Sequence, residues 1–317
     1  MKILVIGGAG YIGGLVVDTL TKHGISTTVY DNLLYEDRFL KQVGFINGDI
    51  RDCEKIKTIS KDYDVLVLMA AIVGDAACSV DTNLTYEINY AAVEKICSSI
   101  PKDKHIIYMS TCSVYGAQNK ILDEDSPTNP LSEYARTKLK AEAHVRDRGG
   151  TIFRLGSVFG LGDTHSRIRL DLVVNTLTIK ALQNKEIVIS GGEQWRPIIS
   201  VIDIANYIFE ACMNRQAGTF ILSKENVTIK HLGEKVAKMI PEIKVNYTEI
   251  PFEDARNYRV DNSLSLKTFS YKPQITVEQE IERMIEVFKN KRIKDFNNII
   301  YHNAKYINNL KKTGAFS

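Results

Sequence analysis

A tyrosine and a lysine four residues apart, Tyr134 and Lys138, are the side chains of this sequence best suited to chemistry. On a helix, residues with this spacing lie on one face, one turn from each other. A phenol needs roughly 4 kcal/mol to lose its proton near neutral pH, and an ammonium about 5 Å away supplies roughly 3 kcal/mol. The pair therefore predicts a general base that takes the proton of a substrate hydroxyl. The alternative is a surface pair on an amphipathic helix.

Hydroxyl side chains precede this pair, in the segment Met109–Gly116 (MSTCSVYG). The segment follows a predicted strand, and a hydroxyl there could bridge the substrate hydroxyl and the phenol. Thr111 is the preferred candidate, as a catalytic residue and a substrate contact. Ser113 is a further candidate for substrate contact. The alternative for Ser110 and Ser113 is that their hydroxyls cap backbone groups of the loop.

A glycine-rich loop, Gly7-Gly-Ala-Gly10-Tyr-Ile-Gly13, follows the first predicted strand and opens a helix. Such glycines let the backbone approach a pyrophosphate, whose charge is then met by the helix N-terminus. Asp31 follows the second predicted strand, 18 residues beyond Gly13, where an acid holds the adenosine ribose hydroxyls and repels a 2′-phosphate. The loop and the acid together predict NAD as the cofactor, with Tyr134 and Lys138 beside its nicotinamide ribose. Separately, they could be an ordinary tight turn and a turn residue.

Short apolar runs alternate with helical patterns, which predicts an α/β fold with a doubly wound parallel sheet of the Rossmann type. Predicted strands cover 2–6, 27–30, 43–46, 65–68, 105–109, 151–155 and 219–222, and predicted helices cover 12–22, 84–99, 132–148 and 170–183. Residues 1–160 form the predicted NAD-binding domain, to which 196–223 return. Residues 161–195 and 224–290 form a smaller substrate lobe over the carboxyl edge of the sheet. The segment 291–317 is expected to be a peripheral helix or a loose end.

The amino-acid composition limits the classes of partner and binding site that the chain is expected to have. The chain has 317 residues, 44% hydrophobic and 25% charged, with a formal net charge of +3. This balance favours neither nucleic acid nor an anionic membrane as a partner. Five cysteines at irregular spacing, with no CxxC, read as reduced thiols, and six scattered histidines show no metal-ligand spacing. No bound metal is therefore expected. No signal peptide or membrane-spanning run is recognised, so a cytoplasmic location is expected.

The order of motifs resembles the extended short-chain dehydrogenase/reductases that act on nucleotide sugars, the epimerase/dehydratase family. The motifs are GGAGYIG, VYDNL, GDIRD (48–52), MAAIVG (69–74), STCSVYG, YARTK, FRLGSVFG (153–160) and RPIISVID (196–203). The resemblance implies further cofactor contacts at Tyr11, Ile12, Asn32, Asp49, Ile50, Ala70, Ala71 and Asn89. It also implies that Arg196 and Arg256 grip the diphosphate of a sugar nucleotide, for which a guanidinium is suited. Family members commonly form homodimers, and one is expected here.

Departures from the family pattern narrow the activity. The 4,6-dehydratases of the family carry Asp-Glu after the catalytic threonine, whereas Cys112 and Ser113 stand here, which disfavours dehydration. Ser157 stands where the family usually has an asparagine that contacts phosphate. Asn175 either takes over that phosphate contact or is a plain polar residue of a helix. The segments AAIVGDAAC (70–78), RLDLVVN (169–175) and QWRP (194–197) resemble a subgroup that includes GDP-heptose 4-dehydrogenases.

The sequence thus predicts an NAD-dependent nucleotide-sugar oxidoreductase acting at sugar C4, most simply an epimerase with a transient 4-keto intermediate, like the UDP-sugar 4-epimerases. A net 4-dehydrogenase or 4-keto reductase is the nearest alternative. A 4,6-dehydratase and a non-catalytic dinucleotide sensor are less favoured, the latter because Tyr134, Lys138 and Thr111 are all present.

Overall fold

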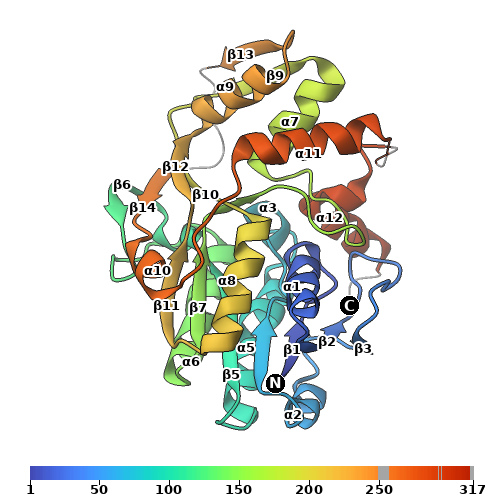
Figure 1. The fold of residues 1–317 in the computed structure, drawn as a ribbon, viewed down its shortest axis with the longest axis vertical. Coiled ribbons are helices and arrows are strands. Elements are labelled where there is room, and N and C mark those ends of the chain that lie inside the picture. The colour runs from blue at the N-terminus through green and yellow to red at the C-terminus, as the bar shows by residue number, and fades with distance from the viewer. Residues whose placement is uncertain (249–256, 292, 294, 315–317) are drawn as a thin grey trace.

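A seven-stranded parallel sheet organises the chain, shown as a computed structural model that describes residues 1–248, 257–291, 293 and 295–314 (Figure 1). The strand order is β11-β7-β5-β4-β1-β2-β3. The order therefore reverses between β1 and β4, and ligands of such sheets bind at that point, outside the carboxyl ends of the strands. The strands are β1 (Lys2–Ile6), β2 (Ser26–Asp31), β3 (Gly44–Asn47), β4 (Val65–Leu68), β5 (His105–Thr111), β7 (Thr151–Leu155) and β11 (Gly218–Leu222).

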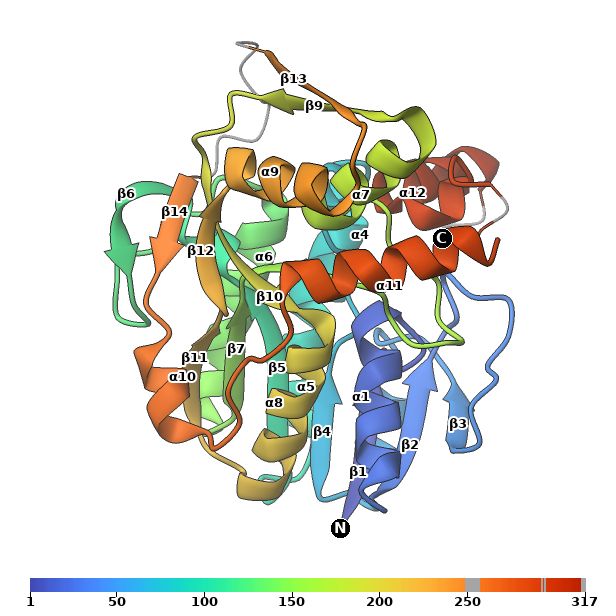
Figure 2. The same cartoon turned by 45° about the horizontal axis from the view of Figure 1, so that its top comes forward.

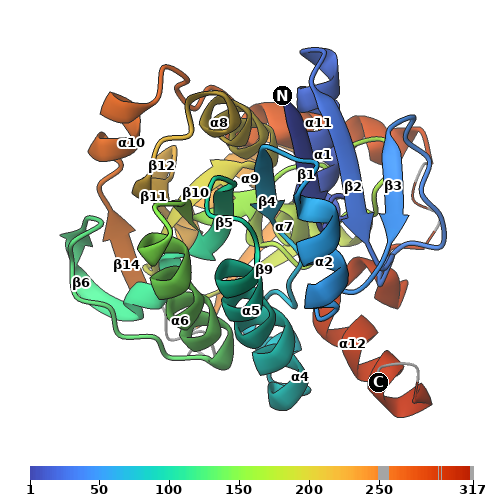
Figure 3. The ribbon, with the colours of Figure 1, turned by 90° about the horizontal axis from the view of Figure 1, so that it is seen from below.

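Helices cover both faces of this sheet, as Figure 3 shows in a view along the strands. One face carries α1 (Tyr11–Lys22) and α8 (Val201–Asn214). The other carries α2 (Cys53–Ser60), α5 (Ala92–Ser99) and α6 (Glu133–Asp147). Alternate residues of β1 enter the two cores, which explains why the strand is apolar throughout. The predicted doubly wound Rossmann sheet is confirmed.

The predicted helix over 84–99 is interrupted by a π-helical turn. Helix α4 (Thr82–Tyr86) leads into the π turn Glu87–Ala91 and then into α5, and the short helix α3 (Asp75–Cys78) precedes them. A π turn holds one residue more than an α turn and rotates the side chains that follow it. Here the turn contains Asn89, which is buried behind the sheet's carboxyl edge.

A further apolar cluster is formed by elements that lie above the carboxyl edge of the sheet (Figure 2). It joins α7 (Val173–Asn184), α9 (Ile229–Met239), α11 (Val277–Lys289), β9 (Glu186–Ser190) and, at its edge, β13 (Lys244–Thr248). Two small sheets connect it to the large one: β8 (Ser157–Phe159), β10 (Trp195–Ser200) and β12 (Glu225–Thr228) in one, β6 (Ala117–Leu122) and β14 (Asn257–Val260) in the other. The remaining elements are α10 (Ser263–Thr268) and the 3₁₀ turns Cys112–Tyr115 and Ile299–Tyr301. Phe269 packs in the core between the sheet and α8, so part of 224–290 belongs structurally to the sheet domain.

The C-terminal segment is more closely packed than the sequence suggests. Helix α12 (Asn303–Thr313) lies against α3, and the side chain of Ile307 is 0% exposed within the same core cluster as β1 and β4. None of the helices in the described part of the chain combines the length and the apolar character needed to cross a bilayer.

We expect Ile307→Ala to lower the free energy of unfolding by about 2–4 kcal/mol, because it removes a fully buried side chain and leaves a cavity. Urea denaturation measures the change. Asn308→Ala, one residue further along α12 and exposed, is the matched control and should change stability by less than about 0.5 kcal/mol. Equal effects of the two substitutions would show that α12 is not part of the core.

Candidate active site

The carboxyl end of β5 brings together the residues predicted to be catalytic. Thr111 is the last residue of β5, and its side chain is hydrogen-bonded to that of Tyr134 on α6. Thr111 Oγ1 also accepts a hydrogen bond from the backbone N–H of Ser113 (3.1 Å). The threonine is thereby held in one orientation, with its hydroxyl against the phenol.

Lys138 lies one turn after Tyr134 and is almost completely buried, at 2% exposure. Its Nζ donates to the carbonyl of Met109 (2.8 Å) and lies 4.7 Å from the ring centre of Tyr108. Burial lowers the pKa of Lys138 to about 8, while Cys78 and Glu142 act to raise it. A buried amine with one carbonyl partner and a depressed pKa is unusual for a purely structural lysine.

The electrostatics of Tyr134 differ from the sequence-based expectation. Burial raises the pKa of the phenol above its ordinary value, and Cys78 and Asp75 raise it further, while Arg169 and the hydrogen bond from Thr111 lower it. Lys138, which donates to Met109, does not offset this burial. Burial therefore favours the protonated phenol, and a role of Tyr134 as a base would need further positive charge, such as that of a bound oxidised nicotinamide.

Helix α6 is fixed on the sheet by buried polar contacts that the sequence analysis did not assign. Glu142 and Arg154 form a doubly hydrogen-bonded ion pair (3.0 and 2.7 Å), and Ser110 Oγ donates to the same carboxylate (2.5 Å). At the other end, Ser132 caps the helix and donates to Asp75 (2.6 Å). Glu142 is four residues after Lys138, so helical spacing alone could have placed it on the same buried face.

The glycine loop fits a pyrophosphate. Gly7 has φ +89°, and side chains at Gly7 or Gly13 would overlap Ala70 and Gly7, respectively. At Gly10, by contrast, a β-carbon would meet only the carbonyl of Gly7 at 3.6 Å. Helix α1 begins at the next residue, Tyr11, with no side-chain cap and no acid in its first turn. Its first N–H groups, including that of Ile12, thus face the position where a phosphate would bind.

Asp31 lies beside this loop at the end of β2. Its carboxylate accepts from the backbone N–H of Ala9 (3.0 Å) and of Leu33 (2.8 Å), and burial raises its pKa. These contacts fix the orientation that ribose binding would require. Asn32 donates to Asp49 (3.3 Å), which also pairs with Arg51. Ile50 is buried next to Asp49. Contact of these two residues with the cofactor stays a prediction.

The loop after β4 is supported from behind by Asn89. Its Oδ1 accepts from the N–H of Ile72 (2.9 Å), and its Nδ2 donates to the carbonyl of the same residue (2.8 Å). This holds the segment that contains Ala70 and Ala71 at the carboxyl edge of β4. Cys78 donates to the Ile72 carbonyl as well (3.2 Å), so the thiol is part of the same support.

The predicted substrate contacts fall into three groups. Arg196, on β10, is buried and donates to the carbonyl of Trp195 (2.9 Å), and Ser113 is buried near Thr111. The Asn175 amide is fully buried and bonds to both backbone groups of Gly160 (3.0 and 2.8 Å), which favours a positioning role over substrate contact. Arg256 lies outside the described residues.

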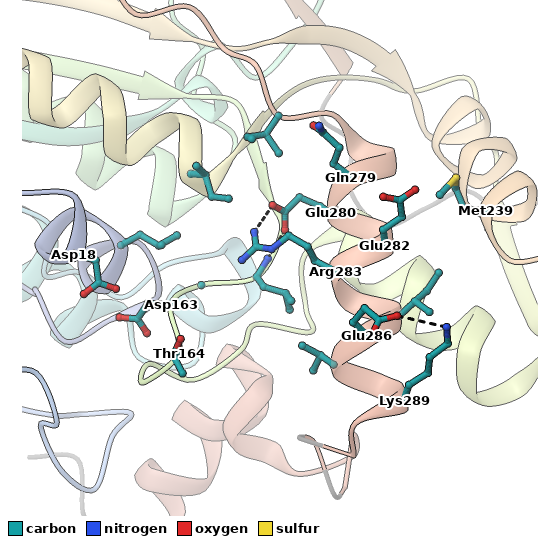
Figure 4. Close-up of a pocket in the computed structure, with 17 residues that line it drawn as sticks. Asp18, Asp163, Thr164, Met239, Gln279, Glu280, Glu282, Arg283, Glu286 and Lys289 are labelled. Carbon is teal, nitrogen blue, oxygen red and sulfur yellow. Dashed lines mark hydrogen bonds and ion pairs between the residues drawn. The ribbon is translucent and has the colours of Figure 1, made fainter. Parts of the chain in front are cut away.

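A cavity of about 1010 Å³ lies away from these residues, between α1, α8, α11 and residues 161–164 (Figure 4). Acidic side chains dominate its labelled lining, among them Asp18, Glu282 and Glu286, and Glu280 pairs with Arg283 (2.5 Å). None of the residues with a predicted role lines it, so it is not the candidate site. In the described part of the chain, no group of three or more His, Cys, Asp or Glu side chains could hold a metal ion.

A dinucleotide loop joined to a Tyr–Lys–Thr set on one parallel sheet defines an NAD-dependent dehydrogenase/reductase-type protein. The chain belongs to the NAD dependent epimerase/dehydratase family, whose profile matches residues 3–221, and NAD is its cofactor.

The relatives agree with this class. The chain is 26% identical to a putative UDP-glucose 4-epimerase of Methanocaldococcus jannaschii, over 91% of this chain and 98% of that one. It is 31% identical to the UDP-glucose 4-epimerase of Halalkalibacterium halodurans, over 70% and 75% of the two chains. The structure of UDP-glucose 4-epimerase with UDP-glucose from Thermotoga maritima matches with a TM-score of 0.79 at 23% identity, over 92% of this chain and 100% of that chain. At that identity the last match shows a shared fold.

We expect the Lys138→Met variant to be at least as stable toward unfolding at pH 7 as the parent protein, while it loses NAD-dependent catalysis. A lysine whose pKa falls from its free value to about 8 on folding opposes folding by about 3 kcal/mol while it is protonated in both states. That penalty is full below pH 8 and fades as the pH rises toward the free value. Denaturation of both proteins across this range measures the difference. A parent that is clearly more stable at pH 7 would show that Lys138 is a structural residue.

Proposed function

We propose that this chain is a nucleotide-sugar epimerase that acts at sugar C4 through a transient 4-keto intermediate. The observation that carries the proposal is the hydrogen-bonded pair of Tyr134 and Thr111 at the carboxyl end of β5, with the buried amine of Lys138 one helical turn away. A phenol paired to a hydroxyl at the cofactor edge of the sheet is arranged to receive a proton from a carbon-bound hydroxyl.

Each residue of the candidate site has its own role in the proposed epimerisation. Thr111 orients the C4 hydroxyl of the sugar, and Tyr134 takes its proton. NAD, held by the glycine loop and Asp31, would supply a reversible acceptor for the C4 hydride, and the epimer forms when the keto sugar presents its other face. Tyr134 gives the proton back to the new hydroxyl, so no net oxidation remains. Arg196 is the candidate contact for the substrate's diphosphate.

The residues after Thr111 argue against dehydration. Elimination of water needs an acid and a base next to the sugar. Cys112 is fully buried, its thiol donates to the carbonyl of Arg154 (3.3 Å), and burial raises its pKa. A thiol held in this way cannot exchange protons with a sugar in the crevice. Relatives named UDP-glucose 4-epimerase support the same choice, although structures of 4,6-dehydratases share the fold.

We expect Tyr134→Phe to reduce the interconversion of C4 epimers by about a hundredfold to ten-thousandfold, the usual loss when a general base is removed. The measurement is isomer formation from UDP- or GDP-sugars without added cofactor. Tyr63→Phe is the matched control, because Tyr63 precedes β4, at the end of the sheet opposite to the site. Full activity of the Tyr134 variant would refute the mechanism.

The same assay distinguishes a net 4-dehydrogenase or 4-keto reductase. An epimerase regenerates oxidised NAD in every turnover, so the near-ultraviolet absorbance of the reduced nicotinamide should not persist. Persistent absorbance after a single turnover, with release of a keto sugar, would replace the epimerase proposal by the oxidoreductase one.

A further inference from the structure

Three segments that are far apart in the sequence meet over the cofactor edge of the sheet: 33–41 after β2, 160–172 after β8, and 300–303 before and into α12. The N–H of Arg167 donates to Glu36 Oε1 (2.7 Å), and the Arg167 guanidinium donates to the carbonyl of Ile300 (2.7 Å) and to Asn303. The N–H of Asn303 donates to Asp171 (2.9 Å), and that of Leu170 donates to the Tyr301 carbonyl (3.0 Å). We call residues 163–171 with 300–303 the latch.

The latch places the guanidinium of Arg169 next to the start of the helix that follows the glycine loop. Arg169 is 13% exposed at its side chain, and its guanidinium lies 6.0 Å from the ring centre of Tyr11, the first residue of α1. Tyr11 itself donates to the carbonyl of Gly160 (2.7 Å), which joins the base of the latch to the start of α1. The positive charge of Arg169 lowers the pKa of both Tyr11 and Tyr134, although burial dominates each. The guanidinium thus lies near the first residue of α1 and close enough to the candidate base to influence its pKa.

The Arg169 side chain uses one of its N–H donors on a neighbouring residue. Its Nε donates to Asp171 (2.9 Å), and among the residues that the structure describes this is the one hydrogen bond that its side chain makes. The N–H groups of Nη1 and Nη2 remain for a ligand. The glycine loop 7–13 contains no basic residue, so the loop itself offers the two charges of a pyrophosphate only backbone N–H groups and the helix dipole.

We propose that Arg169 is a ligand of the cofactor's pyrophosphate, and that the latch holds it there and retards release of the cofactor. A guanidinium can bind two phosphate oxygens at once, and with the N-terminus of α1 it encloses the pyrophosphate from two sides. Asn303 also joins the latch to the loop after β4, because its Nδ2 donates to the carbonyl of Val73 (3.0 Å). The cofactor can then leave only after these contacts open. The inference rests on the family's cofactor and not on the epimerase activity.

Ligand binding tests Arg169 without any turnover. We expect Arg169→Met to weaken binding of NAD and of ADP-ribose to nucleotide-stripped protein by about tenfold to a hundredfold, the range for a lost charge-assisted hydrogen bond, and to leave adenosine binding unchanged. Arg169→Lys, which keeps the charge and loses the fork, should fall in between. Arg136→Met, an arginine on the outer side of α6, is the control.

Unchanged ADP-ribose affinity in Arg169→Met would overturn the proposal. So would a loss confined to UDP or GDP, because Arg169 would then bind the substrate's diphosphate. Thermal unfolding of each variant distinguishes a lost contact from a lost fold. Neither result depends on Tyr134, so failure here is separable from failure of the proposed function.

Release kinetics test the latch. We expect Asn303→Ala to speed dissociation of reduced NAD from the loaded protein by about tenfold or more, since it opens contacts to Arg167 and Val73. Asn308→Ala, exposed on the same helix, is the control and should not change the rate. Equal dissociation rates for the parent and the Asn303 variant would show that the latch does not hold the cofactor.

Discussion

The docking of α6 across β5 is the constraint on which the candidate site depends. Lys138 and Glu142 project from the same face of the helix into the sheet, where one bonds to the Met109 carbonyl and the other to Arg154 and Ser110. These are buried polar groups, and a shift of the helix by one residue would leave them without partners. The register is therefore fixed, and it is the register that brings the Tyr134 phenol to Thr111.

In the proposed mechanism, the raised pKa of Tyr134 would couple proton transfer to cofactor binding. Because burial favours the protonated phenol, it would act on a hydroxyl only once the positive charge of an oxidised nicotinamide is nearby. Arg169 and the hydrogen bond from Thr111 lower the pKa of Tyr134, and Arg169 belongs to the segment that packs against the start of α1. The charge that tunes the base and the charge proposed to hold the cofactor are then the same guanidinium.

Local patterns in the sequence were sufficient for the sheet. The strands over 2–6, 65–68 and 151–155 and the helix from Tyr11 agree with prediction, because each is short, apolar and followed by its own turn signal. Thr111 and Tyr134 could be paired because both lie in motifs with a fixed place on the fold. The pKa of Tyr134 could not be predicted, since burial, which only the fold reveals, outweighs the nearby charges.

The long-range polar contacts could not be predicted from the sequence. Arg167 meets Ile300 and Asn303 across more than 130 residues, and nothing in the local pattern of either segment indicates the other. The π turn at Asn89 likewise accompanies the buried amide's two bonds to Ile72, a contact that helix propensity does not indicate. Asn175 was read as a possible substrate contact because its partner, the Gly160 backbone, is not visible in the sequence.

The place of α12 after the sheet domain in chain order has a consequence for biosynthesis. The sheet, both of its helical layers and the glycine loop are all encoded before residue 223, and can assemble while later segments are still being translated. The contacts of Arg167 and Val73 with Asn303 cannot form until residue 303 has left the exit tunnel. A nascent chain that has not yet reached this point would therefore meet its nucleotide in an open state.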